Sequence, residues 1–182
     1  MRALPNLITL GRLLSAPVLA WLLIQNRFFW ALNLIVLAGV SDWLDGYIAR
    51  RLRLDGRLGV ILDPLADKFL LVTLFVVLAV LRLIPLWMLA LALGRDLVIV
   101  LGATLLRLLR GAHKFLPTML GKVSTFFQIV LVLLSVCFAA FPYQIVLWLK
   151  TTALALSAAF TVLSGLEYVR IGIGMAGRDH NN

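Results

Sequence analysis

Residues 59–81 read GVILDPLADKFLLVTLFVVLAVL, a stretch that is almost wholly apolar after its two aspartates. An α-helix rises 1.5 Å per residue, so about 20 apolar residues are long enough to cross the hydrocarbon core of a bilayer. The stretch therefore predicts a membrane-spanning helix with carboxylates near one end. The alternative is a soluble protein with one buried helix of this kind.

The composition of the whole chain excludes that alternative. Of its 182 residues, 63% are hydrophobic, and the mean hydropathy is +1.05. Soluble domains average about 45–50% apolar residues, so this excess is too large for a surface that faces water. We predict an all-α integral membrane protein with six transmembrane helices, leaving open a short amphipathic helix before the first. The other five predicted spans are 7–25, 29–49, 85–106, 119–141 and 145–169.

The predicted spans form one domain, residues 1–176, followed by a polar tail at 177–182. Pro85, Pro117 and Pro142 lie at the later turns, where helices begin. Most connections are short, so consecutive helices should run antiparallel. The single cysteine excludes an internal disulfide, and the first apolar segment is too long for the core of a cleavable signal peptide.

The basic residues are distributed unevenly between the two ends of these spans. With 17 Lys and Arg against 8 Asp and Glu, the net charge is +9. Because Lys-rich and Arg-rich loops stay in the cytoplasm, we predict cytoplasmic termini in a bacterial inner membrane or its equivalent. Such charge in a membrane protein indicates topology and contact with anionic membrane lipids, and no nucleic-acid partner is expected. The predicted cytoplasmic side holds Arg2, Arg50, Arg51, Arg53, Arg57, Arg107, Arg110, Lys114, Arg170 and Arg178, against Arg27, Arg82 and Lys150 on the other.

Four aspartates lie inside the predicted second and third spans at nearly matching depths. Asp42 and Asp67 are each eight residues from the predicted cytoplasmic end of their helix, which is about 12 Å at 1.5 Å per residue. Asp45 and Asp63 lie nearer the same ends. Because the two helices should be antiparallel, we expect the four carboxylates to meet near the cytoplasmic face.

The spacing of these aspartates predicts a metal site. Asp42 and Asp45 are three residues apart and Asp63 and Asp67 four, so each pair lies on one helix face. Carboxylates inside a membrane are costly, and four together repel one another unless a cation neutralises them. Oxygen ligands suit Mg²⁺ or Mn²⁺, with Ca²⁺ a further candidate, and four can hold two ions about 4 Å apart, as in phosphate chemistry. The structural alternative is that they cap helices or pair with Arg50, Arg57, Lys68 and Arg95.

These residues belong to a longer pattern, DWLDGYIAR at 42–50 and, after eight residues, GVILDPLAD at 59–67. It resembles the signature of the CDP-alcohol phosphatidyltransferases, Asp-x2-Asp-Gly-x2-Ala-Arg-x8-Gly-x3-Asp-x3-Asp. All eight fixed positions match, and the likeness extends to the six-span layout and to the segment PNLITLGR at 5–12. Hereafter "the signature" means residues 42–67.

The resemblance implies an enzyme that holds two divalent ions on its aspartates and uses no organic cofactor. It implies that Asp67 is a further ligand or the general base, while an acceptor hydroxyl attacks the lipid-side phosphorus of CDP-diacylglycerol and CMP leaves. Homodimers are common in the family, so a second copy is an open partner. The implied contacts of the CDP-lipid are Asn6, Thr9, Gly46, Ala49, Arg50 and Gly59. For the glycines and Ala49, close helix packing is the alternative.

Three local features resemble the cardiolipin synthases of this family: AGVSD at 38–42, the Arg95-Asp96 pair, and LPTMLGKVST at 116–125. Ser124 stands where the phosphatidylglycerophosphate synthases often have a second lysine. Paired cations suit a phosphomonoester, whereas one lysine, Lys122, suits a phosphodiester. The predicted acceptor is therefore phosphatidylglycerol, giving cardiolipin, and the alternative is glycerol 3-phosphate, giving phosphatidylglycerophosphate. The predicted acceptor contacts are Arg95, Asp96, Lys122 and Ser124.

Simpler roles remain open for these acceptor contacts. Lys122 could reach only to the membrane interface, and Arg95 and Asp96 could simply pair with each other. For the whole protein, a divalent-cation transporter is the alternative from another class, because intramembrane carboxylates also line ion paths. A scaffold without chemistry is a third. Acids clustered at one face and the lack of an internal repeat favour the enzyme.

Overall fold

The computed structural model describes the backbone of residues 4–52, 59–110 and 118–177, and this part of the chain is all-helical. Within it, the side chains of 4–10, 12–13, 42–52, 59–65, 103, 105–110 and 173–177 lie outside the description. The helices match the six predicted segments to within a few residues, except at the end of the last. They are α1 (Leu4–Ile24), α2 (Phe28–Leu52), α3 (Gly59–Val80), α4 (Leu86–Arg110), α5 (Met119–Ala140) and α6 (Gln144–Gly177).

The helix ends follow from local chemistry. Pro85 directly precedes α4, where its missing N–H costs nothing, and Pro142 lies between α5 and α6. Thr118 caps α5, and its hydroxyl accepts a 3.1 Å hydrogen bond from a backbone N–H of the first turn. Asn26 (φ 56°) and Arg82 (φ 58°) adopt the left-handed conformation that ends helices α1 and α3. Within the part of the chain that the structure describes, α1 is continuous from Leu4, so no separate short helix precedes it there.

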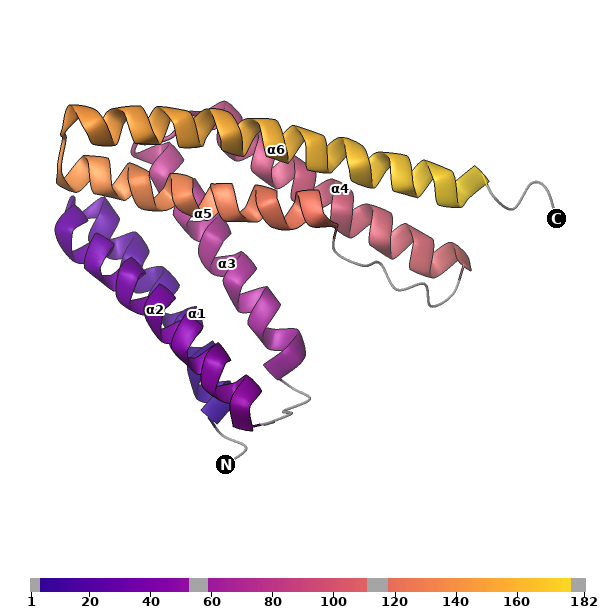
Figure 1. Ribbon diagram of the computed structural model, residues 1–182, viewed down its shortest axis with the longest axis horizontal. Coiled ribbons are helices and arrows are strands. Elements are labelled where there is room, and N and C mark those ends of the chain that lie inside the picture. The colour runs from indigo at the N-terminus through magenta and orange to yellow at the C-terminus, as the bar shows by residue number, and fades with distance from the viewer. Residues whose placement is uncertain (1–3, 53–58, 111–117, 178–182) are drawn as a thin grey trace.

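The six helices alternate in direction and form two groups (Figure 1). In one, α1 packs against both α2 and α3, and in the other, α6 packs against both α4 and α5. Contacts of α5 with α2 and α3, and of α3 with α4, join the groups. The three tight turns gather at one end, so the C-terminal ends of α2, α4 and α6 all point away from it. The bundle thus separates the ends bearing Arg50, Arg110 and Arg170 from the turns bearing Arg27 and Arg82.

Side-chain burial is typical of a protein surrounded by lipid. The core contains Leu19, Leu78 and Met88, but polar side chains are buried beside it, and large apolar side chains cover much of the described surface. Water-soluble monomers rarely expose such wide apolar surfaces, whereas in lipid the polar groups must find partners inside the bundle. The fully buried polar residues are Ser124, Gln128, Ser135, Ser157, Thr161 and Ser164.

Two helical segments within the described residues are long and apolar enough to cross a membrane, Met119–Ala140 and Gln144–Gly172. The apolar segments Leu14–Ile24 and Phe28–Ser41 are shorter. The prediction of an all-helical protein with six helices is therefore confirmed. That each of the six crosses the membrane stays a prediction.

Candidate functional site

The signature lies at the C-terminal end of α2 and the N-terminal end of α3, which point to the same end of the bundle (Figure 1). The backbones of Asp42, Asp45 and Asp63 are helical, but their side chains lie outside the description. Asp67 is described, and its side chain is exposed. Among described residues no three His, Cys, Asp or Glu side chains gather in a group that could hold a metal ion. The predicted four-carboxylate cluster thus remains a prediction.

The two helices that carry the signature, α2 and α3, do not pack directly on each other where the structure describes them. Instead, α1 contacts both of them. The predicted contacts Asn6 and Thr9 lie on this same α1. Their side chains lie outside the description, as do the side chains of Ala49 and Arg50 and the surroundings of Gly46 and Gly59. The residues predicted to bind the CDP-lipid therefore lie on three helix ends, those of α1, α2 and α3.

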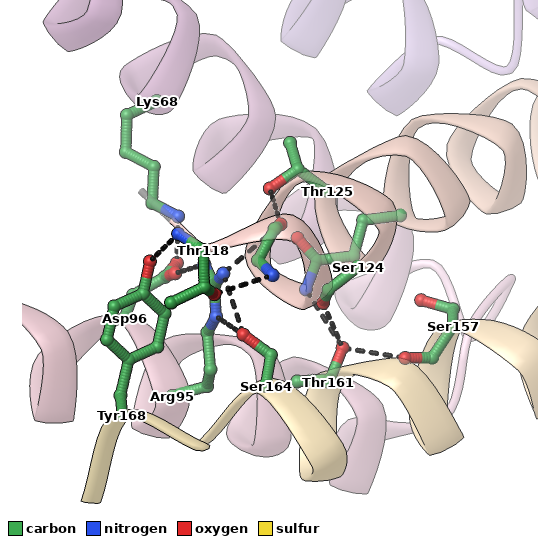
Figure 2. A network of polar contacts seen from close by, with 12 residues as sticks. Lys68, Arg95, Asp96, Thr118, Ser124, Thr125, Ser157, Thr161, Ser164 and Tyr168 are labelled. Carbon is green, nitrogen blue, oxygen red and sulfur yellow. Dashed lines mark hydrogen bonds and ion pairs between the residues drawn. The ribbon is translucent and has the colours of Figure 1, made fainter. Parts of the chain in front are cut away.

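A chain of charges begins one residue after Asp67. Lys68 on α3 forms an ion pair with Oδ2 of Asp96 on α4. The other oxygen of Asp96 accepts a 3.0 Å hydrogen bond from Nη1 of Arg95. Figure 2 shows these side chains together with residues of α5 and α6. We call Lys68, Asp96 and Arg95 the triad. Lys68 therefore pairs with a residue of α4. Arg95 and Asp96 contact each other, as expected under the alternative to their predicted role as acceptor contacts.

Arg95 is anchored by the two C-terminal helices. Its Nε and Nη2 donate to Oγ of Ser164 at 3.2 and 3.1 Å, and Nη2 also donates to the carbonyl of Gly121 at 3.3 Å. The guanidinium carbon lies 5.8 Å from the ring centre of Tyr168, and the hydroxyl of Tyr168 accepts from the Thr118 N–H at 3.1 Å. Arginine suits such a place because its planar fork can bond and stack at once. The guanidinium thus joins the start of α5 to α6.

Gly121 makes this close approach feasible. A Cβ at residue 121 would lie 3.0 Å from Nη2 of Arg95 and 3.1 Å from the hydroxyl of Tyr168, nearer than ordinary contact. Its carbonyl also accepts from the hydroxyl of Thr125 at 3.1 Å. The absent side chain at residue 121 is therefore part of how the triad is held.

A second polar group continues along the α5–α6 contact. Ser124 and Thr161 share a 3.0 Å hydrogen bond, and Nε2 of Gln128 donates to the Thr161 hydroxyl at 3.1 Å. That hydroxyl in turn donates to the Ser157 carbonyl at 2.6 Å, completing the network drawn in Figure 2. We call Ser124, Gln128 and Thr161 the polar seam. Interhelical hydrogen bonds of this kind help helices to associate in lipid.

The predicted acceptor contacts lie in different surroundings. The side chains of Arg95 and Asp96 are 8% and 14% exposed, while Lys122 is exposed. Ser124 is fully buried, with its hydroxyl directed at Thr161. The structure thus joins Arg95 and Asp96 in one network, and it places Ser124 in the polar seam beside it.

Sequence reasoning missed several residues of these networks. Lys68 was considered only as a partner of the signature aspartates, and Tyr168 was not considered. The signal that could have revealed them is the spacing of the polar residues on the last two helices, where one polar residue follows another after three or four positions. That spacing, on a helix that must be apolar outside, indicates a polar inner face. The missed residues of α5 and α6 are Gln128, Thr161, Ser164 and Tyr168, while Thr118 and Gly121 lie in the quoted 116–125 segment but had no predicted contact.

A groove of about 490 Å³ lies at the opposite end of the bundle, next to the α1–α2 turn. Arg27 is its one charged lining residue. Its lining residues on α2 lie between the α1–α2 turn and Leu37, before the signature begins at Asp42, so the groove is not assigned to the candidate site.

An apolar exterior, a polar seam and a charged triad that begins next to an acidic signature are the features of a helical membrane protein with polar contacts inside its bundle. Residues 2–163 match the family model "CDP-alcohol phosphatidyltransferase". The chain belongs to this family of enzymes, which confirms the resemblance described above.

Curated relatives fall into two groups by name. The chain is 32% identical to Homo sapiens cardiolipin synthase (CMP-forming) over 93% of its own length and 61% of the relative's. It is 33% identical to the Bacillus subtilis CDP-diacylglycerol–glycerol-3-phosphate 3-phosphatidyltransferase, over 91% and 92%. It is 34% identical to the chloroplastic enzyme of that second name from Oryza sativa, over 71% and 44%. The chain thus spans about half the length of several relatives.

Proposed function

We propose that this chain transfers the phosphatidyl group of CDP-diacylglycerol to an alcohol acceptor and releases CMP, a step of phospholipid biosynthesis. The observation that supports this most is the signature, eight fixed residues at fixed spacing on two helix ends at one end of the bundle. The family match supports the transferase over the cation transporter and the scaffold. The domain is proposed to be residues 1–176, with 177–182 as a tail.

The signature fits divalent metal ions by its donor chemistry. Its four carboxylates supply only oxygen ligands, and helical spacing puts Asp42 beside Asp45 and Asp63 beside Asp67. Hard cations such as Mg²⁺ and Mn²⁺ prefer these ligands. Two such ions, when bound, would lower the negative charge of the diphosphate and stabilise departing CMP.

The chain's own residues would position the reactants and move one proton. Arg50 would bind the diphosphate, and the small residues of the signature would admit the cytidine. The acceptor oxygen forms a bond to the lipid-side phosphorus while the bond from that phosphorus to the CMP oxygen breaks. Asp67 would take the proton of the acceptor hydroxyl, and its exposed side chain is accessible for this role.

The proposed acceptor is phosphatidylglycerol, which would make cardiolipin. Support for this acceptor comes from the 116–125 segment, which has a single lysine, Lys122. Ser124, at the place of the second lysine, is uncharged and fully buried, so it adds no cation for the acceptor. Glycerol 3-phosphate is the second candidate, because relatives of both names cover most of this chain. A phosphodiester carries one negative charge and a phosphomonoester up to two, so the number of cations should discriminate between them.

The proposed membrane arrangement has six spans, a polar cavity open to the cytoplasm and both termini on that side, in a bacterial inner membrane or its equivalent. The alternating helices and the end bearing Arg50, Arg110 and Arg170 support this orientation. A homodimer is an open possibility that the family suggests.

The deciding experiment supplies purified protein with CDP-diacylglycerol and Mg²⁺, and separately with phosphatidylglycerol, glycerol 3-phosphate, inositol phosphate or serine. We expect CMP release with phosphatidylglycerol and cardiolipin by mass spectrometry. CMP release only with glycerol 3-phosphate would establish the second candidate. No CMP release with any acceptor would contradict phosphatidyl transfer.

A further inference from the structure

Exposure rises in order along the triad. The Arg95 side chain is 8% exposed, that of Asp96 14% and that of Lys68 38%. The buried end is fixed to α5 and α6, and the open end is one residue from Asp67, the proposed base. The triad therefore runs from the interior of the bundle to the edge of the signature.

Arg95 is largely occupied by the protein itself. Four hydrogen bonds from its guanidinium go to Ser164, Gly121 and Asp96. Arginine has five N–H donors, so little capacity is left for a substrate without breaking these bonds. Lys68 differs, because its ammonium has three donors on a flexible stem and its side chain is 38% exposed. Of the two cations, Lys68 is better placed to meet an incoming anion.

We propose that Lys68 contacts the phosphate of the acceptor, and that Asp96, held by Arg95, is a positioning residue that fixes the Lys68 ammonium. This inference rests on the proposed function and adds a residue to it. Two positive charges and one negative leave the triad with one net positive charge. That charge matches a phosphodiester head group, such as that of phosphatidylglycerol, better than a phosphomonoester with two charges.

Replacing Lys68 tests the contact. A charge-assisted hydrogen bond is worth a factor of about ten or more in affinity, so Lys68→Gln should raise the acceptor KM about tenfold. The KM for CDP-diacylglycerol should change less than about twofold, and Lys68→Arg should recover most of the loss because it keeps the charge. Lys150→Gln removes a positive charge from another helix, α6, and is the control; its KM values should match those of the unaltered protein.

Replacing Asp96 tests the positioning role. Asp96→Asn raises the net charge of the triad, so kcat/KM for glycerol 3-phosphate relative to phosphatidylglycerol should rise about fivefold or more. If the role of Asp96 were purely structural, its replacement would lower kcat/KM equally for the two acceptors. That result would overturn the assignment of Asp96 as a positioning residue. Thermal unfolding in detergent checks that the variant folds. If it does not fold, Lys68→Gln still decides, because Lys68 is the most exposed residue of the triad.

The failures of the two proposals are distinguishable. If the unaltered protein releases no CMP with any acceptor, the proposed function fails. If it releases CMP but Lys68→Gln leaves the acceptor KM unchanged, or changes both KM values alike, only the Lys68 contact fails. The same preparation of enzyme serves both measurements, so differences in yield or detergent do not affect the comparison.

Discussion

Ser124 on α5 and Thr161 on α6 share a hydrogen bond across a fully buried contact, with 3.0 Å between their hydroxyl oxygens. The Thr161 hydroxyl also accepts from Gln128 and donates to a backbone carbonyl of its own helix. One side chain thus serves three partners, and the amide oxygen of Gln128 is left without a hydrogen bond. The α5–α6 pair therefore depends on a single hydroxyl for much of its polar contact.

Thr161→Val should lower the free energy of unfolding by about 1 to 2 kcal/mol, because it keeps the shape but leaves buried groups of Ser124 and Gln128 unpaired. The measurement is unfolding in mixed micelles followed by circular dichroism. Thr151→Val is the matched control, since the exposed Thr151 hydroxyl bonds only within α6. Equal effects at the two threonines would contradict the role of the polar seam.

Gly121→Ala should weaken activity toward the acceptor and lower stability, because the new methyl group would meet Arg95 Nη2 at 3.0 Å and the Tyr168 hydroxyl at 3.1 Å. Displacing the guanidinium should raise the acceptor KM about tenfold by loosening Asp96 and Lys68. Gly102→Ala on α4 is the control, with open space around the added Cβ. It should be neutral or gain up to about 1 kcal/mol in stability from helix propensity.

Asp67→Asn should fold and enter the membrane normally but lose CMP release by about 10²- to 10⁴-fold, because the amide cannot take the acceptor proton. Turnover is followed as CMP by chromatography, and folding by thermal unfolding in detergent. Asp55→Asn, an acidic residue outside the fixed signature positions, is the control and should retain activity. Substantial turnover of Asp67→Asn would remove Asp67 from the role of base.

Chelating divalent ions should abolish CMP release, and Mg²⁺ or Mn²⁺ should restore it, because the proposed cluster of four carboxylates would need cations between its members. The unfolding temperature is a second measurement that does not depend on activity. A ligand that binds the folded state raises this temperature, and the rise increases with the concentration of the ligand. Mn²⁺ should raise it for the unaltered protein and for Asp55→Asn, and much less for Asp42→Asn. Activity that persists in chelator would contradict a metal-dependent site.

Membrane topology can be tested with single cysteines in a Cys137→Ser background. A membrane-impermeant maleimide added to intact cells should label Arg27→Cys and Arg82→Cys but not Arg110→Cys or Arg178→Cys, which should react only after the membrane is opened. These pairs lie at opposite ends of the predicted spans. Labelling of all four from outside, or of none, would contradict six spans with cytoplasmic termini.

Hydropathy and proline positions were sufficient to predict the helices. In lipid every backbone group must be satisfied within its own segment, so apolar stretches of this kind fold as helices. The family could also be predicted from the sequence, because the signature is a local pattern of eight residues on neighbouring stretches of the chain. These properties depend on residues close together in sequence, and the observed helix bounds and the family match agree with them.

Contacts between distant segments could not be read in this way. Nothing local indicates that Lys68 pairs with Asp96, or that Arg95 reaches Ser164, 69 residues further on. The predicted antiparallel run of consecutive helices likewise does not indicate that α1 packs on α3 as well as on α2. Periodicity specifies which face of a helix is polar, but the partner of that face depends on how six helices pack together. In lipid that packing is governed by side-chain fit and interhelical hydrogen bonds rather than by hydrophobicity, so it emerges only when all the helices are placed.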